Sequence, residues 1–211
     1  MNSQKPIAAP ADSDQAATSN DYLPLIEWFH FSEPGIQPCV QDTPVSRFRD
    51  AHRFLSNFAA CQIYYEGLMY PSLENAYQAA KCADVGQRIQ FTTISPGDSK
   101  RLGRVVAMRK DWLSVRVSIM EELTDIKYRQ YDFAQRLVDT GNGELSEGNM
   151  HGDTFWGVDL RSGIGENVLG QILMRKRDEL HQYGLPTNPS DEPGLNNAPI
   201  DELIAHWDAQ R

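Results

Sequence analysis

Large hydrophobic residues recur every three or four positions through the second half of the chain, which is the spacing of one helix face. They predict a core helix that Asp111 caps and that contains Trp112, Val115, Ile119, Leu123 and Ile126. We expect this pattern to continue through Phe133, Leu137 and Val138, until Thr-Gly-Asn-Gly at 140–143 ends it. Another helix is predicted from Gly165 onward, with Val168, Leu169, Ile172, Leu173 and Leu180 facing inward.

An alternating pattern from Cys61 to Tyr70 is interrupted by Glu66-Gly67, which is a turn signal. We predict a short β-hairpin here. Pro71 is expected to end its second strand, and Ser72 to cap a new helix by accepting a backbone hydrogen bond. The predicted fold is therefore one mainly α-helical domain with a small β-hairpin and short strands.

The helix that starts at Ser72 has two unlike faces. At about 100° per residue, one face carries Glu74, Tyr77, Gln78 and Lys81, and the opposite face carries Leu73 and several alanines. A solvated polar face with a Glu/Lys pair is one interpretation. The small alanines favour another, in which the helix lies close to its neighbours and holds the polar groups beside the core.

Two further segments supply polar groups near this helix. Arg53, Ser56 and Asn57 precede the hairpin and are equally compatible with ordinary turn chemistry. A helix is predicted from Ser95-Pro96 to Val105, with Lys100, Arg101 and Arg104 forming a basic cluster. This cluster either binds a phosphate or is a solvated charge run.

The segment from Glu144 to Asp159 fits neither an amphipathic helix nor a simple strand. It combines three glycines with acidic, amide, histidine and tryptophan side chains, so we predict a shaped loop. Such a loop suits a ligand with a planar ring at one end and a sugar at the other. Taken alone, Asp153 is also compatible with a turn cap and Trp156 with the core.

Composition and charge restrict the classes of function. The chain has 211 residues, 40% of them hydrophobic, which suffices for one substantial core. The net charge of −9 argues against broad coating of nucleic acid, although a local anion site remains compatible. The sequence has no apolar run of about 20 residues and no signal-peptide pattern, so we expect a cytoplasmic protein without membrane contact. Cys39, Cys61 and Cys82 show no metal-ligand spacing and are expected to be reduced thiols.

Composition also predicts the domain limits. Residues 1–20 contain almost nothing large and apolar and are expected to be a disordered tail. Residues 21–44 form an aromatic and Pro-rich arm, which either packs onto the domain or binds a partner. The domain itself is expected at 45–183, followed by an extension at 184–211 with a short helix near 199–210.

Several ordered sequence blocks resemble the NADAR (YbiA-like) family. They are Arg53-Phe-Leu-Ser-Asn-Phe58, Tyr70-Pro-Ser-Leu-Glu-Asn-Ala-Tyr-Gln-Ala-Ala-Lys81, Lys100-Arg-Leu-Gly-Arg104, Glu147-Gly-Asn149, Gly152-Asp-Thr-Phe-Trp-Gly157 and Gly165-Glu-Asn-Val-Leu-Gly-Gln-Ile-Leu-Met174. The resemblance implies a mostly α-helical fold and an N-glycosidase that acts on ribosylated bases. The implied substrates are phosphorylated riboflavin-pathway intermediates or nucleobases that carry ADP-ribose, including ADP-ribosylated nucleic acid.

The resemblance also implies roles for individual residues. Breaking an N-glycosidic bond builds positive charge on the sugar, so a fixed carboxylate is stabilising, and Glu74 is the first candidate. Its place in the first helical turn favours the ionised form. Asp153 and Asp159 are candidates for a second acidic role, either holding ribose hydroxyls or protonating the base. The expected substrate-binding residues are Arg53, Ser56, Asn57, Tyr77, Gln78, Lys81, Glu147, Asn149, His151 and Trp156.

Within that set, Trp156 is expected to stack on the base, Lys81 or Arg53 to meet a phosphate, and Asn57 and Asn149 to fix sugar or base edges. His151 stands where the family pattern leads us to expect a tryptophan, which bears on base preference. No metal or cofactor is expected, because the sequence has no ligand cluster and no Gly-rich nucleotide motif. The alternatives are a non-catalytic module that binds ADP-ribose or a nucleotide, and an interaction protein that docks through the arm.

Overall fold

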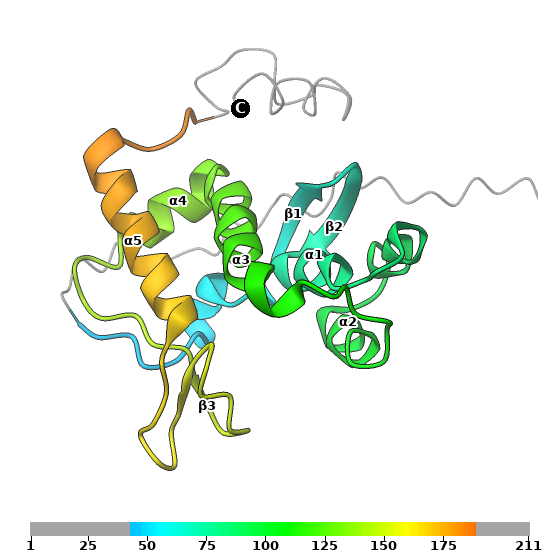
Figure 1. Cartoon of the computed structure of the whole chain (residues 1–211). Helices are drawn as coiled ribbons and strands as arrows, with labels where there is room; N and C mark the ends of the chain where they lie inside the picture. The colour runs from blue at the N-terminus through cyan, green and yellow to red at the C-terminus, as the bar shows by residue number, and fades with distance from the viewer. Residues whose placement is uncertain (1–42, 189–211) are drawn as a thin grey trace, which may run out of the picture. The chain divides into compact units, whose positions relative to one another are not determined.

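The computed structural model describes residues 43–188, all of which fall in one compact unit. These residues form a mainly helical domain with two small pairs of strands (Figure 1). The predicted tail, almost all of the arm and the terminal helix near 199–210 lie outside the described residues. The domain begins with the 3-10 helix η2 (Asp50–Leu55) and ends with α5 (Val168–Tyr183).

The predicted hairpin consists of β1 (Ala60–Tyr65) and β2 (Leu68–Ser72), which pair antiparallel. Glu66 and Gly67 at its turn have positive φ angles of 47° and 81°, which is the geometry of a tight two-residue turn. The prediction that Pro71 ends the second strand is wrong, because β2 continues to Ser72, opposite Ala60. The strand register shifts at this place, so the missing N–H of Pro71 interrupts no regular ladder.

Helix α1 (Leu73–Ala80) starts where the sequence predicts. Ser72 Oγ accepts a hydrogen bond from the Asn75 backbone N–H at 3.2 Å. The Asn75 side chain donates to the carbonyls of Phe91 and Ile94, both at 2.8 Å. It thereby ties α1 to η3 (Val85–Phe91) and to the chain before α2 (Pro96–Leu102). All eight residues of α1 are buried, so the solvated-face interpretation is wrong.

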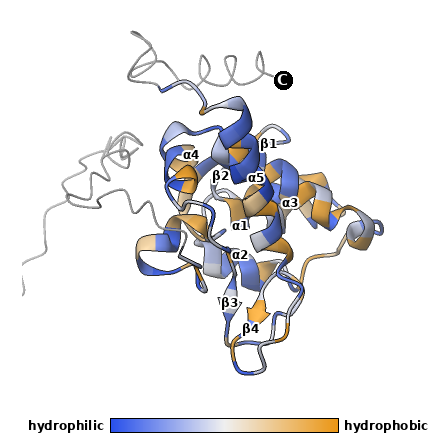
Figure 2. Ribbon diagram, turned by 90° about the vertical axis from the view of Figure 1, so that its left-hand side faces the viewer, coloured by the Kyte–Doolittle hydropathy of each residue, from blue (hydrophilic) through white to orange (hydrophobic). Residues whose placement is uncertain are grey.

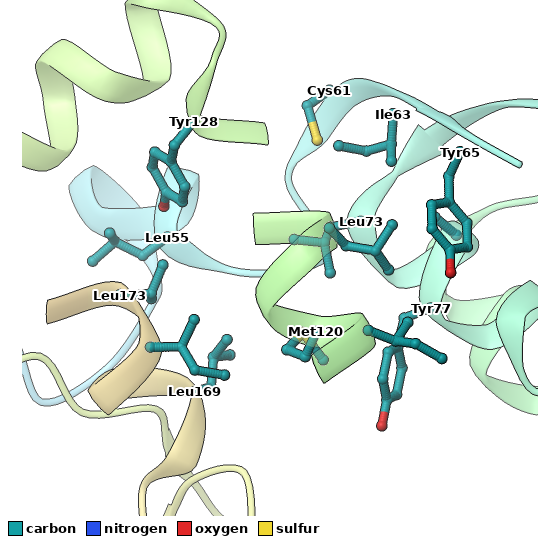
Figure 3. Close-up of a cluster of buried hydrophobic side chains, with 14 of the residues drawn as sticks. Leu55, Cys61, Ile63, Tyr65, Leu73, Tyr77, Met120, Tyr128, Leu169 and Leu173 are labelled. Atoms are coloured by element: carbon teal, nitrogen blue, oxygen red, sulfur yellow. The ribbon is translucent and has the colours of Figure 1, made fainter. Parts of the chain in front are cut away.

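The core lies between α1, the hairpin and the longer helices. Helix α3 (Trp112–Tyr128) lies beside α5 and also packs against α1, β1 and α4 (Figure 1). Figure 3 shows Leu73 and Tyr77 of α1 near Met120 of α3, with Leu169 and Leu173 of α5 in the same apolar cluster. The predicted inward faces of the helices at 112–126 and 168–180 are confirmed.

Two predicted helix limits differ from the structure. The run expected from Asp111 to Val138 is two helices, α3 and α4 (Tyr131–Val138), separated by Gln130 in an extended conformation. The Gln130 side chain donates to the carbonyl of Gln62 in β1 at 2.9 Å, a long-range contact that the local pattern does not contain. Helix α2, capped by Ser95, ends at Leu102 and not near Val105.

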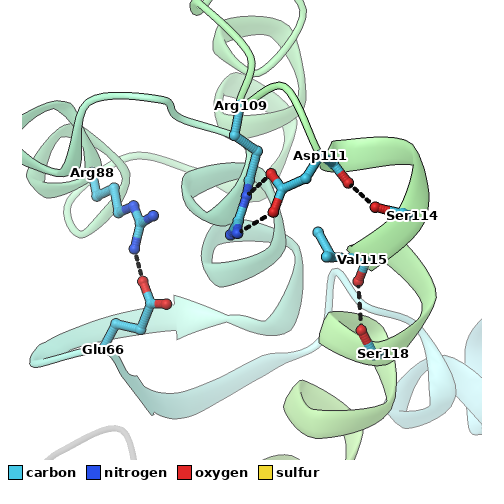
Figure 4. A network of polar contacts seen from close by, with 7 residues as sticks. All are labelled: Glu66, Arg88, Arg109, Asp111, Ser114, Val115 and Ser118. Carbon is cyan, nitrogen blue, oxygen red and sulfur yellow. Dashed lines mark hydrogen bonds and ion pairs between the residues drawn. The ribbon is translucent and has the colours of Figure 1, made fainter.

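Figure 4 shows polar contacts at the hairpin turn and, separately, at the start of α3. Arg88 of η3 forms an ion pair with Glu66 at the turn. Asp111 precedes α3 but makes no side-chain cap, contrary to the prediction. Its carboxylate instead accepts two hydrogen bonds from Arg109, at 2.7 and 2.8 Å. A bidentate guanidinium pair outcompetes a single backbone donor for the same oxygens.

The segment before α5 is the predicted shaped loop. It contains two short parallel strands, β3 (Gly148–Asn149) and β4 (Val158–Asp159), which lie together at one end of the domain (Figure 2). Asn167 precedes α5, but its side chain makes no cap hydrogen bond. Its amide bonds to the backbone of Leu145 and Glu147, so it fastens this loop to the helix start.

Within the described part of the chain, no helix has both the length and the apolar character needed to cross a bilayer. Cys61 and Cys82 are buried and free. No cluster of metal-ligating side chains occurs among residues 43–188.

Candidate active site

The polar face of α1 is held from both directions. The Glu74 backbone N–H donates to the carbonyl of Asn57 at 2.9 Å, and its carboxylate accepts a hydrogen bond from Gln78 Nε2 at 2.7 Å. Only 5% of Glu74 is exposed. Burial raises the pKa of Glu74, and the charges of Lys100 and Lys81 and the Gln78 amide oppose that shift. The prediction that the helix N-terminus favours the ionised form of Glu74 is therefore incomplete, because desolvation has the larger effect on its pKa.

Gly103, at the end of α2, makes room for the Gln78 side chain. A methyl group added to Gly103 would overlap the Gln78 carboxamide. The Oε1 atom of Gln78 is buried and has no hydrogen-bond partner among residues 43–188. The close approach of α2 thus orients the amide so that its N–H points at Glu74.

Tyr77 is the centre of an aromatic group. Its ring centroid lies 4.9 Å from that of Trp112 and 5.6 Å from that of Trp156, which meets it edge-on. Lys81 Nζ lies 5.6 Å from the centroids of both Tyr77 and Trp112. The structure therefore joins the helix 73–80 to the glycine-rich loop through an aromatic contact one turn from Glu74.

Three carboxyl groups influence one another here. Asp153 is near enough for its charge to raise the pKa of Glu74, of Tyr77 and of Glu147. Glu147 has its pKa raised to about 7, mainly by desolvation, with Lys100 and Arg49 opposing the shift. These acids come from α1 and from both sides of β3, which lie far apart in the sequence.

The basic cluster predicted at Lys100, Arg101 and Arg104 is divided. Lys100 faces the acids, since its charge lowers the pKa of both Glu74 and Glu147. Burial is the main cause that lowers the pKa of Lys81, and the nearby charges of Lys100 and Arg104 lower it further. Arg101 pairs with Asp98 at the surface. Lys81, Lys100 and Arg104 are therefore three cations that lie near one another at this site.

Comparison with known proteins identifies the family. The NADAR domain model matches residues 41–181. The chain belongs to the NADAR domain family. It is 33% identical over 151 residues to N-glycosidase YbiA of Escherichia coli K12, a match that covers 69% of this chain and 93% of that protein. The NMR structure of E. coli YbiA matches with a TM-score of 0.61 at 32% identity, covering 70% of this chain and 90% of that one.

A riboflavin biosynthesis protein of Vibrio vulnificus YJ016 is 38% identical over 138 residues. The match covers 63% of this chain but only 36% of that protein, so the chain spans about a third of that relative's length. The YbiA structure confirms the predicted mainly helical fold, and the family match confirms the resemblance.

Several of the expected site residues of this NADAR domain use their polar side-chain atoms in hydrogen bonds within the loop. The Asn149 amide accepts from the N–H groups of His151 and Asp153 and donates to the carbonyls of Asp153 and Val158. Asp153 Oδ1 accepts from the N–H of Trp156 at 3.0 Å. Asp159 accepts from Arg161 and Ser162 in the following turn. Asn149 thus shapes the loop, and Asp153 both fastens it and adds charge to the site.

The residues before the hairpin also have structural contacts. Asn57 offers its carbonyl to Glu74, and its amide contacts Met120 Sδ. Ser56 Oγ accepts from the Phe58 N–H at 3.1 Å, as turn chemistry predicts. The side chains of Arg53 and His151 are exposed. Roles for these residues toward a ligand stay predictions.

Sequence reasoning missed three contributors to this NADAR site. Trp112 lies in the core, as predicted, but the additional contacts of its ring with Tyr77 and Lys81 were not predicted. Arg116 lies 3.6 Å from the ring centroid of Phe155, and its charge reaches Tyr77. The pattern Trp112-x-x-x-Arg116 places both on one face of α3, which is the signal that was available. Arg49 acts on Glu147 from before η2 and carries no comparable signal.

Proposed function

We propose that this chain hydrolyses the N-glycosidic bond of a phosphorylated, ribosylated base, with Glu74 beside the sugar carbon that becomes cationic. In general terms the chain is a hydrolase acting on an N-glycosyl bond, since it belongs to the NADAR family and is similar to proteins named N-glycosidases. The riboflavin biosynthesis name of the Vibrio relative supports a riboflavin-pathway intermediate as substrate. ADP-ribosylated guanine is the second candidate of the same chemical class.

The observation that carries the proposal is the meeting of Glu74 with an aromatic surface. Loss of the base leaves positive charge on C1′ and the ring oxygen, and a buried carboxylate stabilises it strongly because little water screens the interaction. Trp156, which is only partly buried and meets Tyr77 edge-on, offers ring surface to a planar base beside the helix that carries this carboxylate. A ribose lying between the two would place C1′ at Glu74.

The cations support a phosphorylated substrate. Lys81 and Lys100 lie near Glu74, and Arg104 lies near Lys81, in a protein whose net charge is −9. Within residues 43–188, Arg101 forms an ion pair with Asp98, whereas Lys100 forms no ion pair with an acidic side chain. A phosphate on the ribose would therefore supply Lys100 with an anionic partner. Such contacts would position the sugar beside Glu74, so that binding of the phosphate also orients the reacting bond.

The reaction follows from these positions. The C1′–N bond breaks, its electron pair goes to the base nitrogen, and that nitrogen takes up a proton. Water adds to C1′ on the face where Glu74 stabilises the cation, and the products are the free base and a ribose phosphate. The residues of this chain supply charge, orientation and proton transfer for that sequence.

Incubation with a panel of ribosylated bases, followed by mass spectrometry, tests this activity. The panel holds a phosphorylated riboflavin-pathway intermediate, its dephosphorylated form and ADP-ribosylated guanine. We expect free base and ribose phosphate from at least the first compound. Tight calorimetric binding without product over hours would contradict hydrolysis and would instead indicate a module that only binds nucleotides.

A further inference from the structure

Glu147 is held rigidly by its backbone. Its N–H donates to Asn167 Oδ1 at 3.1 Å, and its carbonyl accepts from the Val158 N–H at 3.0 Å. Asn167 is itself fixed, because its Nδ2 donates to the Leu145 carbonyl at 2.9 Å. Contacts with β4 and with the start of α5 therefore fix the backbone position of Glu147.

The side chain of Glu147, in contrast, is not fully engaged. Its Oε2 atom is buried and has no hydrogen-bond partner among residues 43–188. Burying an ionised carboxylate oxygen without a hydrogen-bond partner is unfavourable. A protonated carboxyl group avoids this cost and can donate a hydrogen bond to an acceptor on a bound ligand. Each unpaired group of this kind in a native protein calls for an explanation of its own.

The charges that face Glu147 come from four segments. Lys100 of α2 and Arg49 before η2 favour its ionised form, while Asp153 of the loop and Glu74 of α1 oppose it. Desolvation is the largest effect, and the pKa of Glu147 is raised to about 7. Glu74, by contrast, has the Gln78 amide directly on its carboxylate. Two carboxyl groups with environments this different are suited to different halves of one reaction.

The other two acids are already used as acceptors. Asp153 Oδ1 accepts from the N–H groups of Phe155 and Trp156. Both oxygens of Asp159 accept from the turn that follows it. These contacts tie both side chains to the backbone and side chains of their own loop.

We propose that Glu147 is the catalytic residue that donates the proton to the departing base, while Glu74 stabilises the cationic sugar. This inference rests on the proposed hydrolase activity. As the C1′–N bond breaks and its electron pair moves to the base nitrogen, the Glu147 O–H bond breaks and its proton joins that nitrogen. The water that adds to C1′ then gives up a proton, which restores the acid form of Glu147.

The test compares Glu147→Gln with the parent on two leaving groups. One substrate is the phosphorylated riboflavin-pathway intermediate, whose base needs a proton to depart. The other is p-nitrophenyl ribofuranoside 5-phosphate, whose leaving group departs without one. We expect kcat of the variant to fall by about 10²- to 10⁴-fold on the first and by less than about tenfold on the second, with KM little changed.

The pH profile gives a second readout in the parent enzyme. With the first substrate, kcat should decline as the pH rises through the pKa of an acid that must be protonated, and this decline should be absent with p-nitrophenol as leaving group. Glu144→Gln, an exposed residue of the same loop, is the matched control and should behave as the parent does.

Equal losses on both substrates would overturn the inference, because they would indicate a structural or binding role for Glu147. Unchanged turnover of the first substrate by the variant would also overturn it. Either result would leave the hydrolase activity of the parent intact. Failure of the proposed function is recognised separately, by a parent that cleaves neither compound.

Discussion

The Gln78 side chain links helix α1 to the end of α2 and also contacts the Glu74 carboxylate. Its amide N–H reaches Glu74 at 2.7 Å, and its carbonyl end lies against Gly103 of α2. The sequence placed Glu74 and Gln78 on one helix face correctly, since helical spacing determines that. The contact with Gly103 joins residues 25 positions apart and no local pattern contains it.

Gly103→Ala should therefore impair catalysis without touching the substrate. The new methyl group overlaps the Gln78 carboxamide, so that the amide moves and releases the Glu74 carboxylate. Misplacement on the order of 1 Å can cost about 10²-fold in rate, and we expect kcat to fall by up to that amount. Steady-state kinetics measures the effect.

Gly97→Ala is the matched control for this change. A Cβ at Gly97 meets its nearest atoms at 3.9 Å, which is ordinary contact, so kcat should stay at the parental value. Equal kcat values for Gly103→Ala and the parent would show that Gln78 does not position Glu74.

Among the elements, α1 and the hairpin were predictable and the α3–α4 boundary was not. The cap at Ser72 and the Glu66-Gly67 turn are local, and both occur as predicted. At the end of α3, the Gln130 side chain donates a hydrogen bond to the distant Gln62 carbonyl, and no local sequence pattern contains this contact. The loop 144–159 was recognisable by composition, but which of its polar groups face inward depends on contacts with Asn167 and α1.

Lys127 of α3 shows the same dependence on distant contacts and leads to a pH prediction. Its Nζ is buried and donates to the carbonyls of Phe54 and Ser56 at 2.6 and 3.0 Å. Burial lowers the pKa of Lys127 from 10.5 to about 8. Between these values the unfolded chain binds more protons at this group than the folded one, so its contribution to the free energy of unfolding rises with pH.

Lys127→Met removes that contribution. The difference in free energy of unfolding between parent and variant should shift in favour of the parent from about pH 8 to 10.5. The slope should approach about 1.4 kcal/mol per pH unit, because one proton is involved. Urea unfolding at several pH values measures it. A difference that is constant across this range would mean that Lys127 titrates alike in both states.

For the whole molecule, charge distribution matters more than net charge. The value of −9 argues against general attraction to phosphates, but it could not place Lys81 and Lys100 near the buried Glu74 or Arg104 near Lys81. Only the packing of α2 against α1 separates Lys100, which faces Glu74, from Arg101, which pairs with Asp98.

Lys100→Gln should change the preference for phosphate. If Lys100 contacts the substrate phosphate, kcat/KM should fall by about 10- to 100-fold more for the phosphorylated substrate than for its dephosphorylated form, as for a lost charge-assisted hydrogen bond. The ratio of the two values cancels any effect through Glu74. Arg101→Gln, next to it in α2, should leave the ratio unchanged. An unchanged ratio for Lys100→Gln would place the phosphate elsewhere.

The role of Glu74 is tested most directly by the rate at which enzyme in excess releases base from a phosphorylated riboflavin-pathway intermediate. We predict that Glu74→Gln keeps its substrate affinity, measured by calorimetry, and its melting temperature, yet releases base at least about 10³-fold more slowly than the parent. Glu144→Gln should match the parent. Release by Glu74→Gln as fast as by the parent would contradict the assignment of Glu74 as the group that stabilises the cationic sugar.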